Sequence, residues 1–130
     1  MQAVYYRGAH GHEPVNDYIG RLSIERQVEI DTTINLLNRL QPTDPPLPFP
    51  HSSQVEGQLR ELRCHYGREL YRVLYRRSGN LFVLLHILQK RTERIPEADK
   101  QIARERWADF KARMDAIPRK PPRAAGHDAP

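Results

Sequence analysis

The chain contains a single cysteine, Cys64, so it cannot form an internal disulfide bond. A lone cysteine is typical of proteins in a reducing compartment, and we therefore expect a cytoplasmic protein. No apolar run approaches the roughly 20 residues that a membrane helix needs, and the N-terminal sequence lacks the apolar stretch of a signal peptide. His10, His12 and Glu13 have metal-like spacing, but they fall in a loop and no other His/Cys cluster exists, so we expect no metal and no cofactor.

A length of 130 residues fits one domain, and it is sufficient for one buried core that needs no disulfide bonds or structural metal ions for stability. From residue 118 onward the sequence reads PRKPPRAAGHDAP, which is polar, rich in proline and aperiodic. We therefore expect a folded domain over residues 1–116 and a disordered tail over residues 117–130.

The formal net charge of +5 is concentrated in one segment. Residues 60–94 contain nine Lys and Arg against three Asp and Glu, so this segment carries +6 and the rest of the chain −1. Eight of the nine basic residues are Arg, which is suited to bidentate phosphate contact. The clustering favours a polyanion site, with ordinary surface charge as the alternative interpretation.

The first forty residues predict one short strand and two helices. Residues 2–7 are β-prone, and residues 14–22 begin with proline and carry apolar residues at helical spacing. Ser23 is the expected N-cap of a longer helix that reaches residue 40. Two adjacent helices of this kind predict an antiparallel hairpin that covers one face of a sheet.

The next segment changes from helical to strand periodicity. Residues 41–50 hold five prolines and predict an extended loop, with Leu47 and Phe49 packed on the core. Three strands joined by hairpin turns are predicted at residues 58–65, 70–76 and 81–88. The third is almost entirely apolar, so we expect it to be central, with both of its faces covered.

Pro96 begins the last predicted helix, and Trp107 is expected to anchor that helix to the core. The element order predicts an α+β fold with a small, twisted antiparallel sheet of about four strands. An N-terminal helical hairpin and a C-terminal helix pack on one face, and the strand at residues 2–7 pairs at the side away from the first meander strand. The other face, or the open end of the sheet, is then free to bind a ligand.

Alternation along the strands brings polar residues of the meander onto one face. Glu61, Arg63 and His65 share a face of the first strand, and antiparallel pairing can bring Arg63 near Arg72 of the second. Two neighbouring arginines repel each other unless an anion lies between them. The anion can be a bound phosphate or the carboxylate of Glu61, and burial of the arginine stems on the sheet is a third interpretation.

Four short strings occur in order along the second half of the chain: Glu-Leu-Arg at 61–63, Tyr-Arg-Val-Leu-Tyr at 71–75, Leu-Leu-His at 84–86 and Lys-Arg-Thr at 90–92. With Pro-Val at 14–15 and the PLPFPH loop at 46–51, they resemble the HigB branch of the RelE/ParE toxin superfamily, the phage-derived-protein-like group. The resemblance covers residues 3–114. The chain departs from it at Ile87-Leu88, where Gly-Phe is usual, and at Lys90-Arg91, where a double lysine is usual.

The resemblance implies a RelE-like fold and the toxin of a type II toxin–antitoxin pair, an endoribonuclease that cleaves mRNA on the ribosome, inhibits translation and arrests growth. The implied partners are a helix-turn-helix antitoxin, the ribosome with its mRNA, and operator DNA through the toxin–antitoxin complex. The implied chemistry is metal-independent attack by the RNA 2′-hydroxyl, with fixed cations stabilising the phosphorane. The predicted catalytic residues are Arg72, Arg63, Lys90, Arg91 and Glu61. The predicted RNA-binding residues are Arg60, Arg68, Arg76, Arg94 and His65.

Several alternatives stay open at this point. A gyrase poison without enzymatic activity, as in the ParE branch, and an inactive regulatory partner are the competing functions. Lys90 is the candidate acid or base, with Glu61 as the carboxylate alternative. His86 lies in the middle of the most apolar strand, which favours a satisfied core histidine over a catalytic one. Tyr71 and Tyr75 are expected to pack against the core helices.

Overall fold

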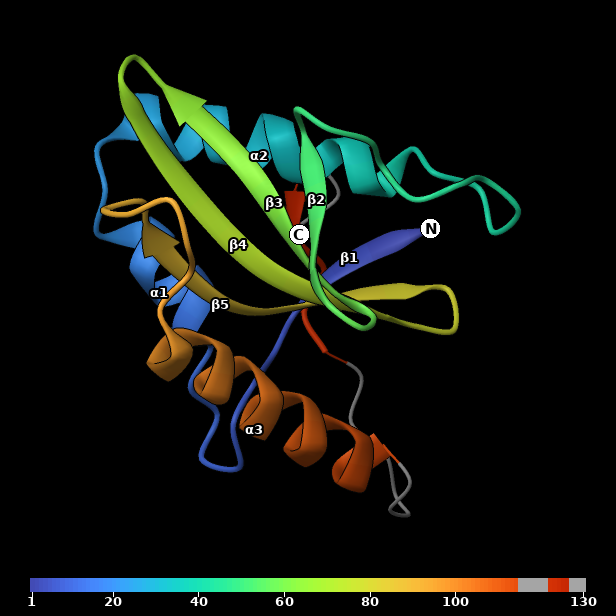
Figure 1. The fold of residues 1–130 in the computed structure, drawn as a ribbon. Helices are drawn as coiled ribbons and strands as arrows, with labels where there is room; N and C mark the ends of the chain where they lie inside the picture. The colour runs from blue at the N-terminus through green and yellow to red at the C-terminus, as the bar shows by residue number, and fades with distance from the viewer. Residues whose placement is uncertain (115–121, 127–130) are drawn as a thin grey trace.

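The computed structural model describes residues 1–114 and 122–126, which form a five-stranded sheet and three helices (Figure 1). The strands are β1 (Gln2–Tyr5), β2 (Ser52–Glu56), β3 (Leu59–Tyr66), β4 (Glu69–Ser78) and β5 (Leu81–Gln89). The helices are α1 (Pro14–Gly20), α2 (Ile24–Asn38) and α3 (Glu97–Met114). The α+β class predicted from the sequence is confirmed.

The sheet is mixed, with the strand order β1-β5-β4-β3-β2. Strands β2 to β5 form an antiparallel meander, whereas β1 runs parallel to β5, with Gln2 opposite Leu81. The prediction of an antiparallel sheet of about four strands is therefore wrong in two respects. It did not foresee that β1 is parallel to its neighbour, and it missed β2. The segment SSQVE is short and mostly polar, so β2 carries too little apolar alternation to be recognised as a strand.

Glycines at the hairpin turns set the register of the meander. Gly67 and Gly79 have φ values of 59° and 58°, and each occupies the first position of a two-residue loop. Glycine adopts positive φ without the steric cost of a Cβ atom, so these turns confirm the two predicted hairpins. The resulting register places Arg63 directly opposite Arg72.

The helices cover both faces of the sheet. Residues of α1 and α2, among them Val15 and Ile34, form one core cluster with Leu62, Val73 and Leu84. Residues of α3 form a second cluster on the opposite face, with Leu74, Val83 and Leu85 of β4 and β5. The central position of β5 is thus confirmed, but the expectation that all helices lie on one face is wrong.

The two N-terminal helices begin where the sequence predicts, and Ser23 caps α2 by accepting a hydrogen bond from the Arg26 amide at 3.3 Å. Their arrangement differs from a paired hairpin. α2 packs mainly on β3 and β1, whereas α1 packs mainly on β5, and each helix contacts the sheet more than it contacts the other. The turn of Ser23 separates them, so each helix buries its own apolar stripe.

Residues 122–126 run along the free edge of β1. The Tyr5 amide donates to the carbonyl of Arg123 at 2.9 Å, and the Ala125 amide donates to the carbonyl of Ala3 at 2.8 Å. Ala125 is fully buried in the core cluster of α1 and α2. The expectation of a disordered tail is therefore wrong for this stretch, and the rest of residues 117–130 lies outside the described residues.

Candidate nucleic-acid interface

A cluster of three charged residues lies on the face of the sheet that α3 also occupies. Glu61 and Arg63 point to this side because Leu62, between them, packs on the side of α2. Arg72 of β4 lies opposite Arg63, and Glu61 contacts both arginines. Its Oε1 is 3.0 Å from Nη1 of Arg63, and its Oε2 is 3.3 Å from Nε of Arg72.

Two members of this cluster are buried charges, since Glu61 is 5% and Arg72 is 4% exposed. A buried charge is stable only when it is paired and hydrogen-bonded. The hydroxyl of Ser53 in β2 donates to Glu61 Oε1 at 2.9 Å, and Nη2 of Arg72 donates to the carbonyl of Glu93 at 3.0 Å. Of the three interpretations of the arginine pair, the structure shows the carboxylate between the two cations.

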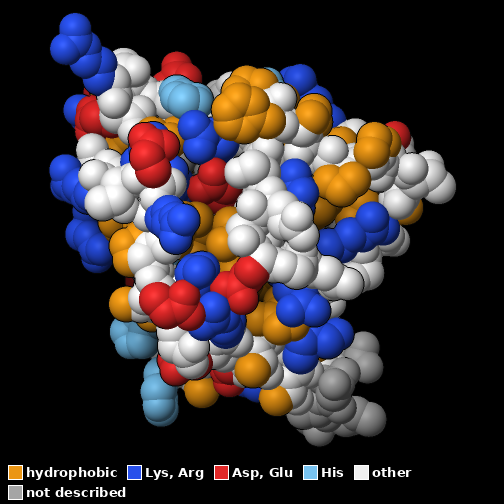
Figure 2. Space-filling model, viewed as in Figure 1, with side chains coloured by type: hydrophobic (Ala, Val, Ile, Leu, Met, Phe, Trp, Pro, Cys, Tyr) orange, Lys and Arg blue, Asp and Glu red, His pale blue; other side chains and the backbone are white. Residues whose placement is uncertain are grey.

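The cluster lines an open groove of about 500 Å³ between the sheet and the N-terminal end of α3. The charged residues that line it are Glu61, Arg63, Arg72, Glu93, Arg94 and Lys100, with a net charge of +2. Nε of Arg63 is buried and makes no hydrogen bond within the described part of the chain, whereas Nε of Arg72 is buried against Glu61 in the ion pair at 3.3 Å. Lys and Arg side chains, with carboxylates among them, are spread over the meander and α3 on the face in Figure 2. The groove therefore offers fixed cations and a net positive charge to an anion.

A family model matches most of the chain, including the strands and the loop around this groove. The model is described as Phage derived protein Gp49-like (DUF891), and it matches residues 17–108. The chain belongs to this family. The family is associated with the toxins of toxin–antitoxin pairs, which confirms the phage-derived part of the predicted resemblance. The narrower HigB assignment stays a prediction, and no curated protein matches the chain.

The groove of this Gp49-like chain brings together four of the ten predicted site residues: Glu61, Arg63, Arg72 and Arg94. Lys90, a fifth, lies beside the groove, where its Nζ is 3.2 Å from Oε1 of Glu93. Lys90 does not line the groove itself, but it is ion-paired with Glu93, which does.

Other predicted RNA-binding residues lie elsewhere on the molecule. Arg60 lies on the α2 side, where Nη2 donates to the carbonyl of Leu47 at 2.8 Å. The guanidinium of Arg76 lies 4.4 Å from the Trp107 ring centroid, so it packs on α3. Arg68 is exposed at the β3–β4 turn, and His65 is exposed near the end of β3.

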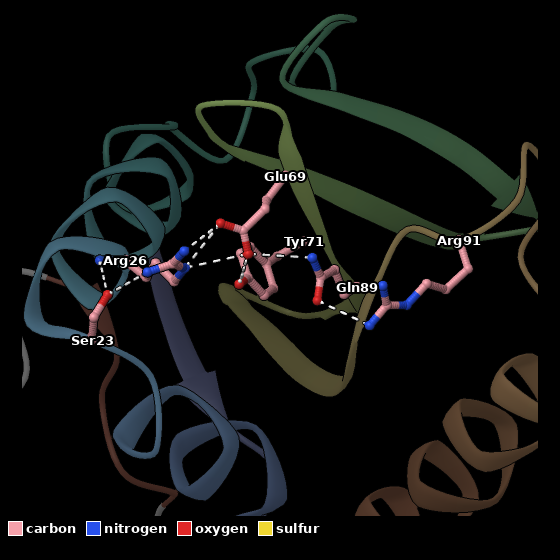
Figure 3. Close-up of polar contacts among 6 residues, drawn as sticks. All are labelled: Ser23, Arg26, Glu69, Tyr71, Gln89 and Arg91. Carbon is pink, nitrogen blue, oxygen red and sulfur yellow. Dashed lines mark hydrogen bonds and ion pairs between the residues drawn. The ribbon is translucent and has the colours of Figure 1, made fainter.

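Arg91 belongs to a separate polar cluster on the opposite face (Figure 3). Glu69 accepts hydrogen bonds from Arg26 of α2, from the Tyr71 hydroxyl at 2.8 Å and from Gln89 at 3.3 Å, while Arg91 donates to Gln89 at 3.4 Å. The bonds from Arg26 and Tyr71 lower the pKa of Glu69. This cluster ties the start of α2 to the sheet, and the buried ring of Tyr71 packs there as predicted.

His86 also lies outside the groove. Its Nε2 is 2.7 Å from Oδ1 of Asp99, and its Nδ1 is 3.3 Å from Nη1 of Arg106, both residues of α3. Burial, and then the charge of Arg106, lower the pKa of His86. Because both ring nitrogens are engaged by α3, the structure agrees with a satisfied histidine that links β5 to the helix.

Seven of the eleven residues that line the groove were not among the predicted site residues, and three of the seven supply a hydroxyl, a cation and an aromatic ring to it. Ser53 belongs to β2, the strand that was not predicted. Lys100 lies on the first turn of α3, where charged residues are frequent and no sequence pattern distinguishes one of them from the others. Phe49 was expected to pack on the core, but it is 69% exposed at the groove, whereas Leu47 is partly buried as expected. The only feature of the sequence that could have indicated an exposed ring is the position of Phe49 between two prolines in a loop.

None of the helices within residues 1–114 and 122–126 is long and apolar enough to cross a membrane. In the same described residues, no group of three or more His, Cys, Asp or Glu side chains is arranged to hold a metal ion.

Proposed function

We propose that this Gp49-like protein is the toxin of a type II toxin–antitoxin pair and an endoribonuclease that cleaves mRNA on the ribosome. The observation that carries the proposal is the cluster of Arg63, Glu61 and Arg72 in a groove of net positive charge. The association of the family with toxins supports the biological role. A helix-turn-helix antitoxin would be the neutralising partner, and the pair would bind operator DNA.

Arg63 and Arg72 supply the electrostatic part of the chemistry. They face each other across β3 and β4, so the non-bridging oxygens of one phosphate can contact both guanidiniums. Cations that are already fixed before reaction stabilise the negative charge that develops on a phosphorane. Burial strengthens this effect because it lowers the local dielectric constant.

RNA supplies its own nucleophile. The 2′-oxygen attacks the adjacent phosphorus, the bond from phosphorus to the 5′-oxygen breaks, and the products are a 2′,3′-cyclic phosphate and a 5′-hydroxyl. In the proposal, Glu61 takes the 2′-proton on Oε2, which accepts no hydrogen bond among the described residues and lies next to the arginines that would hold the phosphate. Lys100, which also lines the groove, gives a proton to the departing 5′-oxygen.

The proposal is tested by inducing the protein in bacterial cells and mapping new 5′ ends on translated messages by primer extension. Arg72→Ala and Arg63→Ala remove the phosphate contacts, and Arg77→Ala removes an exposed arginine of the same strand outside the groove. We expect in-frame cuts and growth arrest for wild type and Arg77→Ala, and loss of the cuts for the two groove variants. Thermal denaturation of each purified variant establishes that it is folded.

The other outcomes separate the competing functions. Growth arrest with intact messages would refute the nuclease proposal and favour a poison of the gyrase-directed type. No growth arrest with folded wild-type protein would favour a regulatory partner that binds an antitoxin without acting on RNA.

A further inference from the structure

Phe49 exposes an aromatic ring beside the charged groove. It is 69% exposed and lines the groove together with Arg63 and Arg72. Leaving a phenyl ring in water forgoes about 2 kcal/mol of burial free energy, so the exposure is not explained by packing. An exposed ring next to fixed cations is the combination by which proteins hold single-stranded nucleic acid.

The position of the ring is fixed by the same elements that build the groove. The guanidinium carbon of Arg63 lies 5.1 Å from the Phe49 ring centroid, a cation–π distance. The loop is tied to β3 because the Arg63 amide donates to the carbonyl of His51 at 2.8 Å. The His51 and Ser52 amides both donate to the carbonyl of Pro48 at 3.1 Å, which closes the loop around Phe49.

We propose that Phe49 is a specificity-determining residue, which stacks on the nucleobase next to the phosphate held by Arg63 and Arg72. This inference rests on the proposed endoribonuclease function. Every base has a π face, so stacking tolerates any sequence, but the larger ring system of a purine stacks more strongly. The protein is therefore expected to cut single-stranded RNA preferentially where a purine flanks the scissile phosphate.

The first test maps 5′ ends across all messages in cells that express wild type, Phe49→Ala, Phe49→Tyr or Val28→Ala. Val28 is the matched control because it is an exposed apolar residue on α2, away from the groove. We expect Phe49→Ala to lower the yield of cuts about tenfold and to abolish the purine enrichment beside them. Phe49→Tyr keeps the ring and should retain both, as should Val28→Ala.

A second measurement separates stacking from a general loss of activity. A short RNA with 2′-O-methyl groups cannot be cleaved, and 2-aminopurine placed at successive positions reports stacking through quenching of its fluorescence. We expect quenching at one position with wild type and Phe49→Tyr, and none with Phe49→Ala, at protein concentrations that saturate the RNA.

The outcomes distinguish this inference from the proposed function. Phe49→Ala with the same cut yield and the same base distribution as wild type would overturn the stacking role while the nuclease function stands. A wild-type protein that makes no cuts would overturn the proposed function, and the role of Phe49 in specificity with it.

Discussion

Glu61 illustrates how one side chain sets the charge balance of the groove. It is buried between Arg63 and Arg72, which lie opposite each other on neighbouring strands. Each guanidinium repels the other, and the carboxylate offsets that repulsion at contact distances of 3.0 and 3.3 Å. One carboxylate does not neutralise two guanidiniums, and the charged residues that line the groove keep a net charge of +2 that can attract a second anion.

Replacing Glu61 with glutamine should therefore destabilise the protein and should make it respond to anions. Loss of the carboxylate leaves Arg72 as a buried charge without its partner, which costs about 3 kcal/mol in the free energy of unfolding. Inorganic phosphate should restore part of this loss. The measurement is urea unfolding with and without phosphate at constant ionic strength.

Glu56→Gln is the matched control, since Glu56 pairs with Arg104 at the surface, where the loss should be smaller and insensitive to phosphate. Equal responses of the two variants to phosphate would show that the arginine cluster is not an anion site.

His86 should make stability depend on pH near neutrality. Its lowered pKa means that the unfolded chain, with an ordinary value near 6.5, takes up the proton first as the pH falls. Stability is therefore complete above about pH 6.5 and declines below it, by up to about 1.4 kcal/mol per unit of pKa lowering. Melting temperatures between pH 7.5 and pH 5 measure the decline.

His86→Gln should flatten this pH dependence, because glutamine can still bond to Asp99 but does not titrate. His65→Gln, at an exposed position, should leave it unchanged. A pH profile of His86→Gln that matches wild type would assign the decline to other groups.

At the scale of elements, local signals predicted more than long-range ones. The cap at Ser23, the glycine turns at Gly67 and Gly79 and the apolar run of β5 are properties of neighbouring residues, and each is confirmed. The parallel pairing of β1 with β5 and the packing of α3 on the second face depend on the path of the chain between distant elements. Patterns within a short segment carry no information about that path. Residues 122–126 (PRAAG) are too short to show a period, and their order comes from the open edge of β1.

Gly126→Ala should loosen this C-terminal segment from β1. Gly126 has a φ of 79°, and a Cβ atom there would lie 2.8 Å from Nδ2 of Asn38, so both strain and a clash oppose the substitution. We expect faster hydrogen exchange of the Tyr5 amide, which donates to Arg123. Exchange measured by NMR at residue resolution reports this directly.

Gly67→Ala separates the two causes, because Gly67 also has positive φ but its Cβ would meet no atom within 4 Å. It should lower global stability by about 1 kcal/mol without selectively exposing Tyr5. Selective exposure of Tyr5 in both variants would mean that the segment detaches for reasons unrelated to its contact with α2.

At the scale of the whole molecule, the sequence shows which segment carries the basic excess but not on which faces of the fold those residues lie. The basic excess of residues 60–94 is divided among faces, since Arg60 and Arg91 lie on the α2 side while Arg63, Arg72 and Arg94 line the groove. Strand alternation could separate residues within β3 and β4, and so it correctly grouped Glu61, Arg63 and Arg72. It could not assign residues in turns and loops, because a loop has no fixed period.

If RNA binds in the groove, the salt dependence of binding should reflect the groove cations rather than the total charge. Each phosphate contact to single-stranded RNA contributes about −0.7 to the slope of log affinity against log salt concentration. Arg94→Ala with Lys100→Ala removes two groove cations and should reduce the slope by about 1.4. Arg39→Ala with Arg68→Ala changes the net charge equally at exposed positions outside the groove and should leave the slope unchanged. Fluorescence anisotropy of a 2′-O-methylated RNA over a KCl series measures the slope for each double variant. Equal slopes for the two double variants would place RNA binding on the general surface instead of the groove.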